Sequence, residues 1–218
     1  MSSLLALGAL RRAFDGRAVL DIGHLALEAG QGYVMTGSNG SGKTTLLRAL
    51  AGLEPASIDG LVFEGRPVAG YPDWLRKKIV YVHQQPYLFH TSIAANIGYG
   101  LRARGVSGPE YERRVREAMA WAGLGALAAT PPAKLSGGEK QKVALARARV
   151  LDPRIFMFDE PTASLDGDAR AQTIALVGEL VDADHCVVVA CHDRELIELP
   201  HMHRLHLEDG GIAPVREA

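Results

Sequence analysis

Short apolar runs separated by turn-forming residues fill the beginning of the chain. Between residues 4 and 36 these runs are divided by Asp15-Gly16 and by Gly30-Gln31-Gly32, a pattern typical of antiparallel strands. The opening "MSSLLALGALRRAF" is apolar first and basic afterwards, the reverse of a secretory signal, and it predicts a first strand. Buried strands are predicted at "GYVMTG" and "KIVYVHQ", and a hairpin at "IDGLVFEGRPV".

Helical periodicity marks two further stretches. In "TTLLRALAG", Leu46, Leu47 and Leu50 fall on one helical face, with Gly52 as a C-terminal cap. In "SGPEYERRVREAMAWAGL" a longer apolar stripe follows the spacing i, i+4, i+7, i+8 and i+11, and Pro109 fits the first helical turn. The stripe consists of Tyr111, Val115, Ala118, Met119 and Ala122. Because strand signals are absent from about residue 90 to 150, this region predicts a helical insertion.

Strands and helices alternate again from residue 155, with strands at "RIFMFDE" and "CVVVACHD", a helix near 168–181 and a last hairpin at "HRLHLEDGGIAPV". Such alternation predicts an α/β fold, with a mainly parallel sheet covered by helices on both faces. We therefore expect one domain over residues 1–218. Its core and antiparallel β part take up about 1–84 and 151–218, and its helical part about 85–150.

Composition narrows the class of protein. The 218 residues are 47% hydrophobic with a formal net charge of −1, an ordinary globular profile that argues against a nucleic-acid binder relying on bulk charge. No apolar run reaches the roughly 18 residues needed to span a bilayer. Cys186 and Cys191 lie too far apart along one predicted strand for a bridge, so we expect reduced thiols and a cytoplasmic protein.

Two histidines near the end of the chain invite comparison with a metal site. On a strand His201 and His203 would share a face, but no cysteine or carboxylate joins them at ligand spacing. We expect solvent-facing histidines on the final hairpin instead.

A glycine-rich loop between a strand and a helix carries the clearest chemistry. "GSNGSGKTT" fits the pattern G-x-x-x-x-G-K-[ST], in which backbone N–H groups approach phosphate oxygens, Lys43 adds a charge and the Thr44 hydroxyl is placed to ligate Mg²⁺. The flanking strand and helix disfavour a chance glycine turn. The expected nucleotide-binding residues of the loop are Gly37, Ser38, Asn39, Gly40, Ser41, Gly42, Lys43, Thr44 and Thr45.

Polar residues at the ends of two later strands extend this site. Asp159, at the end of "RIFMFDE", can hold Mg²⁺ through its water shell, and Glu160 can polarise the attacking water as general base. The alternative is that this pair caps the following helix. His192 ends the next strand, where its side chain is placed to reach a γ-phosphate.

A second phosphate cradle is predicted where the Ser-Gly-Gly turn of "PPAKLSGGEKQKVALARAR" opens a helix. The combination resembles the nucleotide-binding subunits of ATP-binding-cassette (ABC) transporters over nearly the whole chain, which implies a P-loop NTPase (RecA-like) core. "LSGGE" matches the family's signature, "SLD" its D-loop, "CHD" its switch histidine and "VHQQPYLF" its Q-loop. Pro86 assigns the Q-loop role to Gln84 before Gln85, and "RRAFDG" offers Phe14 as the aromatic that stacks on adenine.

The resemblance implies a site shared by two copies of the chain. The signature of one copy covers the ATP held by the phosphate loop of the other, in an antiparallel homodimer. Mg²⁺ is held by Thr44, Gln84 and Asp159, and Lys43, Glu160 and His192 are catalytic. The signature residues are Leu135, Ser136, Gly137, Gly138 and Glu139, and the D-loop residues are Ser164, Leu165 and Asp166, of which Asp166 couples the two sites.

Two residues depart from the family's commonest pattern. Glu139 stands where Gln is most frequent, and Cys191 where Thr or Ser is usual. A buried neutral thiol packs acceptably, and acidic variants of the signature are frequent. We expect neither to alter the ATPase activity.

The resemblance favours an importer subunit, because "LFHTSIAANIGYGLRARG" is similar to the stretch that follows the Q-loop there. It implies permease subunits, a separate solute-binding protein, no nucleic acid, and a place on the inner face of the cell membrane. The chain ends soon after "LEDGGI", so we expect no fused membrane domain and no C-terminal regulatory domain. Compact subunits of this kind resemble those for uptake of tungstate- or molybdate-type oxyanions.

Two other classes of cassette protein are considered. One is the short ATPase of a non-importing membrane machine, such as those for lipoprotein release or cell division, which also carries "LSGGE". The other is the soluble cassette ATPase of translation or DNA repair. This chain shows neither the two cassettes of the translation type nor the coiled coils and zinc modules of the repair type.

Overall fold

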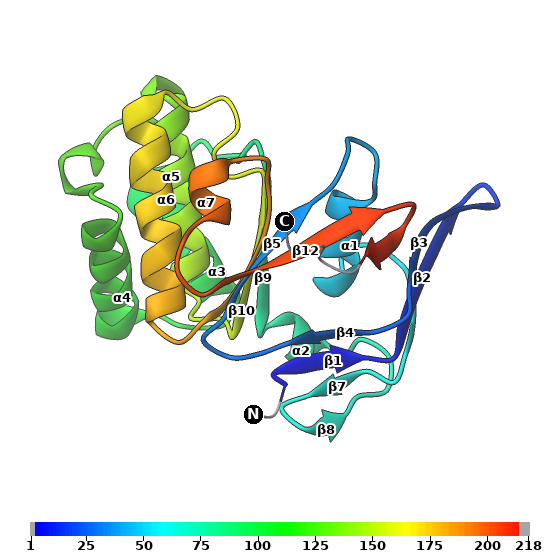
Figure 1. The fold of residues 1–218 in the computed structure, drawn as a ribbon. Helices are drawn as coiled ribbons and strands as arrows, with labels where there is room; N and C mark the ends of the chain where they lie inside the picture. Colours follow the sequence, from blue (N-terminus) through cyan, green and yellow to red (C-terminus); the bar gives the residue numbers. More distant parts are fainter. Residues whose placement is uncertain (1–2, 214–218) are drawn as a thin grey trace.

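A six-stranded sheet in the order β13-β12-β5-β11-β10-β9 forms the centre of the computed structural model, which describes residues 3–213 (Figure 1). Every pairing in this sheet is parallel except that of β12 with β13. The carboxyl ends of β5, β9, β10, β11 and β12 therefore lie at the same edge. The strands are β5 (Gly32–Thr36), β9 (Ile79–Val82), β10 (Ile155–Asp159), β11 (Cys186–Ala190), β12 (Met202–Glu208) and β13 (Gly211–Ala213).

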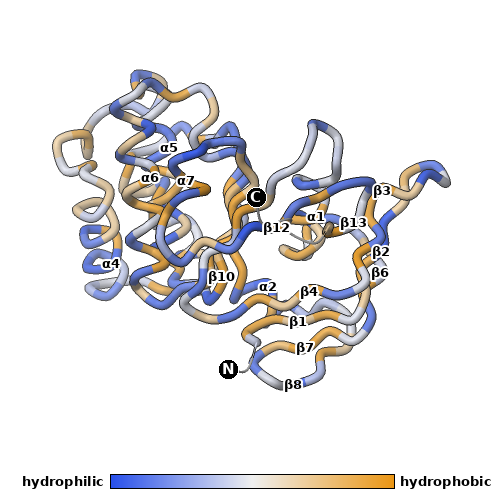
Figure 2. The backbone as a smooth tube through the Cα atoms, in the orientation of Figure 1, coloured by the Kyte–Doolittle hydropathy of each residue, from blue (hydrophilic) through white to orange (hydrophobic). Residues whose placement is uncertain are grey.

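Helices cover both faces of this sheet. Side chains alternate along each strand, so Met157 packs with α1 (Lys43–Leu50), whereas its neighbours Phe156 and Phe158 pack with α5 (Gly137–Arg149) and α6 (Gly167–Asp182). Strands buried on both faces are hydrophobic throughout, and Figure 2 shows this along β10. The predicted α/β fold with a mainly parallel sheet is confirmed.

Two smaller antiparallel sheets, β4-β1-β7-β8 and β3-β2-β6, come from the beginning of the chain. Their strands are β1 (Leu5–Leu7), β2 (Ala9–Phe14), β3 (Arg17–Ile22), β4 (Leu25–Leu27), β6 (Ser57–Asp59), β7 (Val62–Phe63) and β8 (Arg66–Pro67). The prediction of a single first strand was wrong, because the chain bends at Gly8 and β1 and β2 enter different sheets. The prediction of antiparallel strands up to residue 36 was also wrong at its end, since β5 pairs in parallel with β11 and β12.

The region after β9 is helical as far as β10. The helices α3 (Ile93–Ala103), α4 (Gly108–Trp121) and α5 enclose a hydrophobic cluster of their own. Two short 3₁₀ helices, Gly125–Leu127 and Pro132–Lys134, lie between α4 and α5 in the chain. Val115, Ala118, Met119 and Ala122 are buried in this cluster, and Tyr111 packs against it. Pro109 lies in the first turn of α4, as predicted. Two further helices, α2 (Asp73–Arg76) and α7 (Arg194–Ile197), have one turn each.

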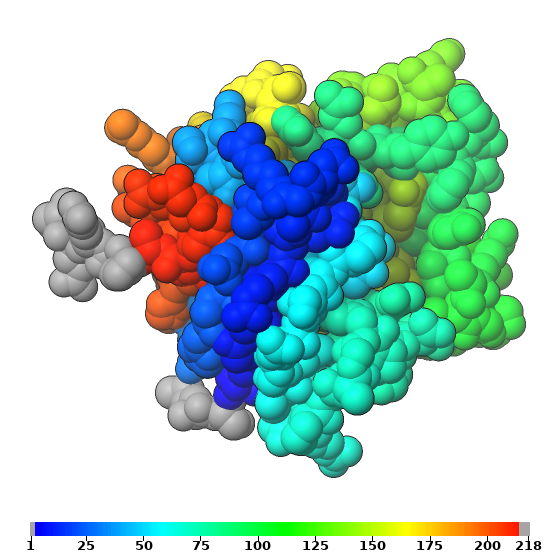
Figure 3. Space-filling view, turned by 90° about the vertical axis from the view of Figure 1, so that its right-hand side faces the viewer, coloured from blue at the N-terminus to red at the C-terminus, as the bar shows by residue number. Residues whose placement is uncertain are grey.

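The final hairpin of β12 and β13 adds to the sheet beside β5. Its expected last residues, 214 and 215, lie outside the described part of the chain. The turn of this hairpin contacts β3, where the Asp21 N–H donates to the Gly210 carbonyl oxygen at 2.8 Å, and Figure 3 shows the last strands beside the first ones on one face. His201 lies in the turn before β12 with φ 61°, so it does not share a strand face with His203 as predicted.

Candidate functional site

The carboxyl edge of the parallel sheet gathers the segments singled out in the sequence. Gly37 follows β5, Gln84 follows β9, Asp159 ends β10 and His192 follows β11, and these four strands are neighbours. Ligands of open α/β sheets bind at the carboxyl ends of the strands. The fold therefore places the candidate phosphate, metal and switch segments at the usual position of a ligand site.

Two glycines of the phosphate loop are required by close backbone contacts. Gly37 has φ 142°, and a Cβ atom there would lie 2.3 Å from the carbonyl oxygen of Leu207. Gly42 has φ 102°, and a Cβ atom there would lie 2.8 Å from a methyl carbon of Leu20. The loop is thus packed between β12 and β3, and only glycine fits at these positions without strain.

The start of α1 is arranged to receive an anion. Its N-cap is Gly42, which has no side chain to occupy the first-turn N–H groups, and no acidic residue lies in that turn. Lys43 is 8% exposed, and its Nζ donates to the carbonyl oxygens of Gly37 (2.8 Å) and Ser38 (3.0 Å). The buried Ser41 Oγ has no hydrogen-bond partner among the described residues. Free helix N–H groups, a fixed ammonium and an orphaned hydroxyl fit a phosphate group.

Thr44 and Asp159 meet beside this loop. The Thr44 hydroxyl donates to Asp159 Oδ1 at 3.1 Å, and the hydroxyl of Tyr81 donates to Asp159 Oδ2 at 2.8 Å. Asp159 is 7% exposed. A buried carboxylate beside a hydroxyl supplies the hard oxygen atoms that Mg²⁺ prefers. Gln84 and Gln85 both lie exposed in the loop after β9, so the choice between them stays a prediction.

Glu160 is held in an unusual backbone conformation next to the switch histidine. Its φ is 47°, its N–H donates to the Ala190 carbonyl oxygen at 2.8 Å, and its Oε1 lies 3.6 Å from His192 Nε2. Burial raises the pKa of Glu160, while nearby His192 and Lys43 lower it. A non-glycine residue at positive φ is strained, and such residues cluster at functional sites.

Phe14 lies at the end of β2 with 42% of its surface exposed. The Arg12 guanidinium carbon lies 4.1 Å from the centre of the Phe14 ring, and Arg12 in turn pairs with Glu54 at 2.6 Å. The same hairpin contacts the phosphate loop through Leu20 and Gly42. An exposed ring on this hairpin is available to stack on a planar base.

The signature segment forms a capped helix start on the other side of the sheet from α1. Ser136 is the N-cap of α5, its Oγ accepts from the Glu139 N–H (3.2 Å), and Glu139 Oε2 accepts from the Ser136 N–H (2.7 Å). This reciprocal pair gives Glu139 a structural role that suits an acidic residue. Gly138 is required because a Cβ there would lie 2.4 Å from the Cβ of Ala169 on α6. Leu135 is buried at the start of the segment.

The D-loop leads into α6, and an arginine of that helix binds the switch loop. Asp166 is the N-cap of α6, accepting from the Ala169 N–H at 2.9 Å, and Ser164 has φ 65°. Arg170 binds both carboxylate oxygens of Asp193 (2.6 and 2.7 Å), the residue after His192. The Arg170 side chain thereby lowers the pKa of Asp193. Sequence reasoning missed Arg170 and Tyr81.

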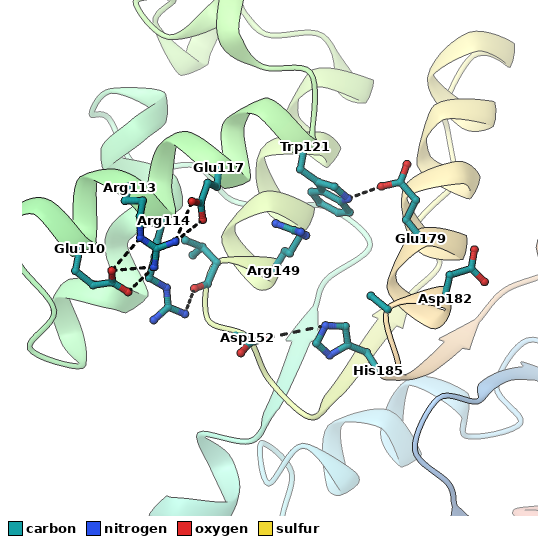
Figure 4. A pocket seen from close by; sticks show the side chains of 12 residues that line it. Glu110, Arg113, Arg114, Glu117, Trp121, Arg149, Asp152, Glu179, Asp182 and His185 are labelled. Carbon is teal, nitrogen blue, oxygen red and sulfur yellow. Dashed lines mark hydrogen bonds and ion pairs between the residues drawn. The ribbon is translucent and has the colours of Figure 1, made fainter.

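A cavity of about 740 Å³ lies between α4, α5 and α6, away from the phosphate loop (Figure 4). Arg113 lies between Glu110 and Glu117 and binds both, and the Trp121 Nε1–H donates to Glu179 at 2.6 Å. The lining carries more carboxylates than arginines, so this cavity does not favour an anion.

Neither a metal-binding cluster of side chains nor a membrane-spanning helix is found among the described residues, 3–213. No cluster of three or more His, Cys, Asp or Glu side chains able to hold a metal ion occurs among them. In the same range no helix has the length and hydropathy required to cross a bilayer. Cys186 and Cys191 are buried free thiols, and burial raises their pKa values to about 12 and about 11.

A family profile and individual relatives in sequence both match this chain to one protein family. The sequence profile of the ABC transporter family matches residues 20–163. The chain is 39% identical over 193 residues to the Fe(3+) ions import ATP-binding protein FbpC of Streptomyces avermitilis, covering 88% of this chain and 56% of that protein. It is 37% identical over 197 residues to the sulfate/thiosulfate import ATP-binding protein CysA of Brucella melitensis, covering 87% and 55%.

A solved structure shows the same fold. CbiO1 from Clostridium perfringens, described as part of the ABC transporter complex cbiONQ, matches with a TM-score of 0.85 and 26% identity over 98% of this chain and 88% of that one. The chain spans about half the length of the curated relatives that it matches.

Proposed function

The chain belongs to the ABC transporter family, and from this we propose that it is the ATP-hydrolysing subunit of an importer. The observation that carries the proposal is the edge of the sheet where the uncapped start of α1, Lys43 and the Thr44–Asp159 pair lie together. A phosphate group fits the first two, and a divalent cation fits the last. We propose ATP with Mg²⁺ as the substrate of this site.

The metal would be held by Thr44 and Asp159, with Gln84 reaching it from the loop after β9. When bound, Mg²⁺ neutralises charge that develops on the transferred phosphoryl oxygens. The hydroxyl of Thr44 has lone pairs free for a cation while its proton is donated to Asp159. The residues present therefore fit the ion.

Hydrolysis is assigned to the residues around the strained turn at Glu160. The Glu160 carboxylate takes the proton of the attacking water as general base. His192, 3.6 Å away, holds its side chain toward the same space and contacts the γ-phosphate. Lys43 turns from the two loop carbonyls to the phosphate oxygens, and Phe14 stacks on the adenine ring. The raised pKa of Glu160 makes it a stronger base than an exposed glutamate.

The complete site is proposed to form between two antiparallel copies. The phosphate loop opens α1 on one face of the sheet, whereas Ser136, Gly137 and Gly138 open α5 on the other face. This separation supports action of the signature on the partner's nucleotide. A two-fold interface of this kind is self-complementary, so one chain supplies both halves, with Asp166 of the D-loop between them.

The permease is proposed to contact the segment after Gln84. Tyr87 and Tyr99 are 67% and 55% exposed and both pack against the ring of Phe89. Arg147 of the signature helix donates to the Tyr87 carbonyl oxygen at 2.8 Å. This contact links the surface to α5, which supports the proposal that residues of about 85–150 act as one unit that transmits nucleotide binding to the membrane partner. The chain would then sit at the inner face of the cell membrane.

For the cargo we propose an oxyanion of tungstate or molybdate type, delivered by a separate solute-binding protein. The sulfate/thiosulfate import relatives support an oxyanion, whereas the Fe(3+) import relatives carry a cation. A non-importing machine for lipoprotein release or cell division is the alternative function, and the import descriptions of the named relatives favour the first.

The test uses a tagged Glu160→Gln protein. This variant is expected to bind ATP and to hydrolyse it roughly 10²–10⁴-fold more slowly, because the positioned base is removed. It is purified with Mg·ATP from gently solubilised native membranes, and Glu208→Gln, an exposed change at the end of β12, serves as the matched control. A small polytopic permease among the bound chains supports the importer. A partner with a large extracytoplasmic domain supports the alternative, and soluble partners alone contradict a transport function.

A further inference from the structure

Tyr81 lies outside the nucleotide-binding motifs, yet its hydroxyl reaches the carboxylate of Asp159. That hydroxyl donates to Oδ2 at 2.8 Å, while the Thr44 hydroxyl donates to Oδ1 at 3.1 Å. Each carboxylate oxygen therefore has one donor, and the two donors come from different elements, β9 and α1. With both oxygens bound, the carboxylate cannot rotate freely about its Cβ–Cγ bond.

The register of β9 and β10 explains how Tyr81 arrives there. Tyr81 is paired with Met157 in a parallel ladder, and Ile155 is paired with Ile79. Alternate residues share a face, so Ile79 and Tyr81 lie on the α1 side with Ile155, Met157 and Asp159. The long side chain of Tyr81 reaches along the strand to the carboxylate two residues beyond its own partner.

Packing fixes the tyrosine ring. Tyr81 is partly buried against the hydrophobic cluster under α1, and the ring of His83 meets it edge-on with the centres 4.6 Å apart. Burial and the hydrogen bond to Asp159 raise the pKa of Tyr81, so the phenol keeps its proton at neutral pH and remains a donor.

We propose that Tyr81 is a positioning residue for the Mg²⁺ site, fixing the Asp159 carboxylate in the orientation that holds the water shell of the ion beside Thr44. The inference rests on the proposed function. Side chains that bind metal-holding carboxylates orient them, and their loss typically weakens metal binding or activity 10–100-fold. Tyr81 acts through Asp159 and is assigned no contact with the nucleotide.

The test is Tyr81→Phe, which removes the hydroxyl and keeps the ring. The affinity for a fluorescent ATP analogue is measured with saturating Mg²⁺ and in EDTA. The ratio of the two affinities reports the metal's contribution, because the effect of Mg²⁺ on ATP binding equals that of ATP on Mg²⁺ binding. We expect this ratio to fall about tenfold or more, with the affinity in EDTA unchanged, and ATP hydrolysis to need more Mg²⁺ for half its maximal rate.

The matched control is Tyr33→Phe. Tyr33 is a buried tyrosine of β5 whose hydroxyl accepts from the Glu28 N–H at 2.9 Å, so the same atom is removed from another strand of the same sheet. In Tyr33→Phe the ratio of the ATP affinity with Mg²⁺ to that in EDTA should equal the wild-type ratio. Tyr81→Met, a second apolar side chain without a donor, should reproduce the change of Tyr81→Phe and tests the proposal should the phenylalanine variant not fold.

Two results would overturn the inference. One is an unchanged ratio in Tyr81→Phe, and the other is an equal loss of ATP affinity with and without Mg²⁺, which would assign Tyr81 to the nucleotide pocket as a whole. Failure of the proposed function itself is distinguishable, because the wild-type protein would then bind no Mg·ATP in the same experiment.

Discussion

At the scale of single residues, the site combines side chains that are already oriented. The Asp159 carboxylate is held by the hydroxyls of Thr44 and Tyr81, and the Asp193 carboxylate by two N–H groups of the Arg170 guanidinium. The last of these stabilises the loop that carries His192, because Asp193 is its neighbour and also caps α7. Pre-oriented groups require less reorganisation when charge develops in the transition state.

Arg170→Met is expected to lower the melting temperature at pH 7 relative to the wild type. The pKa of Asp193 is lowered in the folded protein, so the ion pair stabilises the fold above the ordinary aspartate pKa of about 3.9 and its contribution is lost as the pH falls through the folded value. The difference in melting temperature between variant and wild type should therefore shrink between pH 5 and pH 3. Thermal unfolding followed by circular dichroism measures it.

Arg194→Met is the control, since Arg194 is an exposed residue of α7 next to the same loop. It should leave the melting temperature nearly unchanged at every pH. A difference for Arg170→Met that stays constant down to pH 3 would contradict a stabilising role of the Asp193 charge.

At the scale of elements, the close approach of α5 and α6 joins the signature to the D-loop helix. Gly138 of α5 faces Ala169 of α6. A Cβ atom added to Gly137 would lie 4.0 Å from a methyl carbon of Leu165 in the D-loop. The starts of the two helices are therefore in close contact, which places the signature beside the D-loop.

Gly138→Ala is expected to destabilise the fold, because the added Cβ would lie 2.4 Å from that of Ala169. Overpacking costs about 1–3 kcal/mol, which corresponds to a fall in melting temperature of roughly 2–12 °C for a chain of this size. Gly137→Ala, with its nearest contact at 4.0 Å, should change little. Adding Ala169→Gly to Gly138→Ala removes the opposing Cβ and should raise the melting temperature again. A double variant as unstable as Gly138→Ala alone would show that the contact with Ala169 is not the cause.

At the scale of the whole molecule, the phosphate loop and the signature lie on opposite faces of one sheet, which is why a second copy is proposed to complete each site. Hydrolysis would then open the dimer and move the helical part against the permease. The ring cluster of Tyr87, Phe89 and Tyr99, bound to α5 through Arg147, is the surface through which this motion would pass.

Much of this arrangement follows from local patterns in the sequence. The phosphate loop needs its glycines at fixed spacings within one short segment, and the apolar stripe ending at Ala122 needs only helical periodicity, so both are visible in a short stretch. Tyr81 and Arg170 were missed because their partners Asp159 and Asp193 lie 78 and 23 residues away, through strand register and loop packing. The strand parity shared by Tyr81 and Asp159 was the available signal. The break at Gly8 was missed because the run from Leu4 to Leu10 is apolar on both sides of it.

The central claim, that each site is built from two copies, is tested most directly by Ser136→Arg. A large side chain at the start of α5 should prevent the signature from contacting the γ-phosphate held by the partner. Hydrolysis should then be abolished, while the affinity for ATP equals that of the wild type. Ser107→Arg, at the exposed N-cap of α4, places the same charge on another helix start and should retain hydrolysis. Loss of ATP affinity in Ser136→Arg, or hydrolysis at the wild-type rate, would contradict the account.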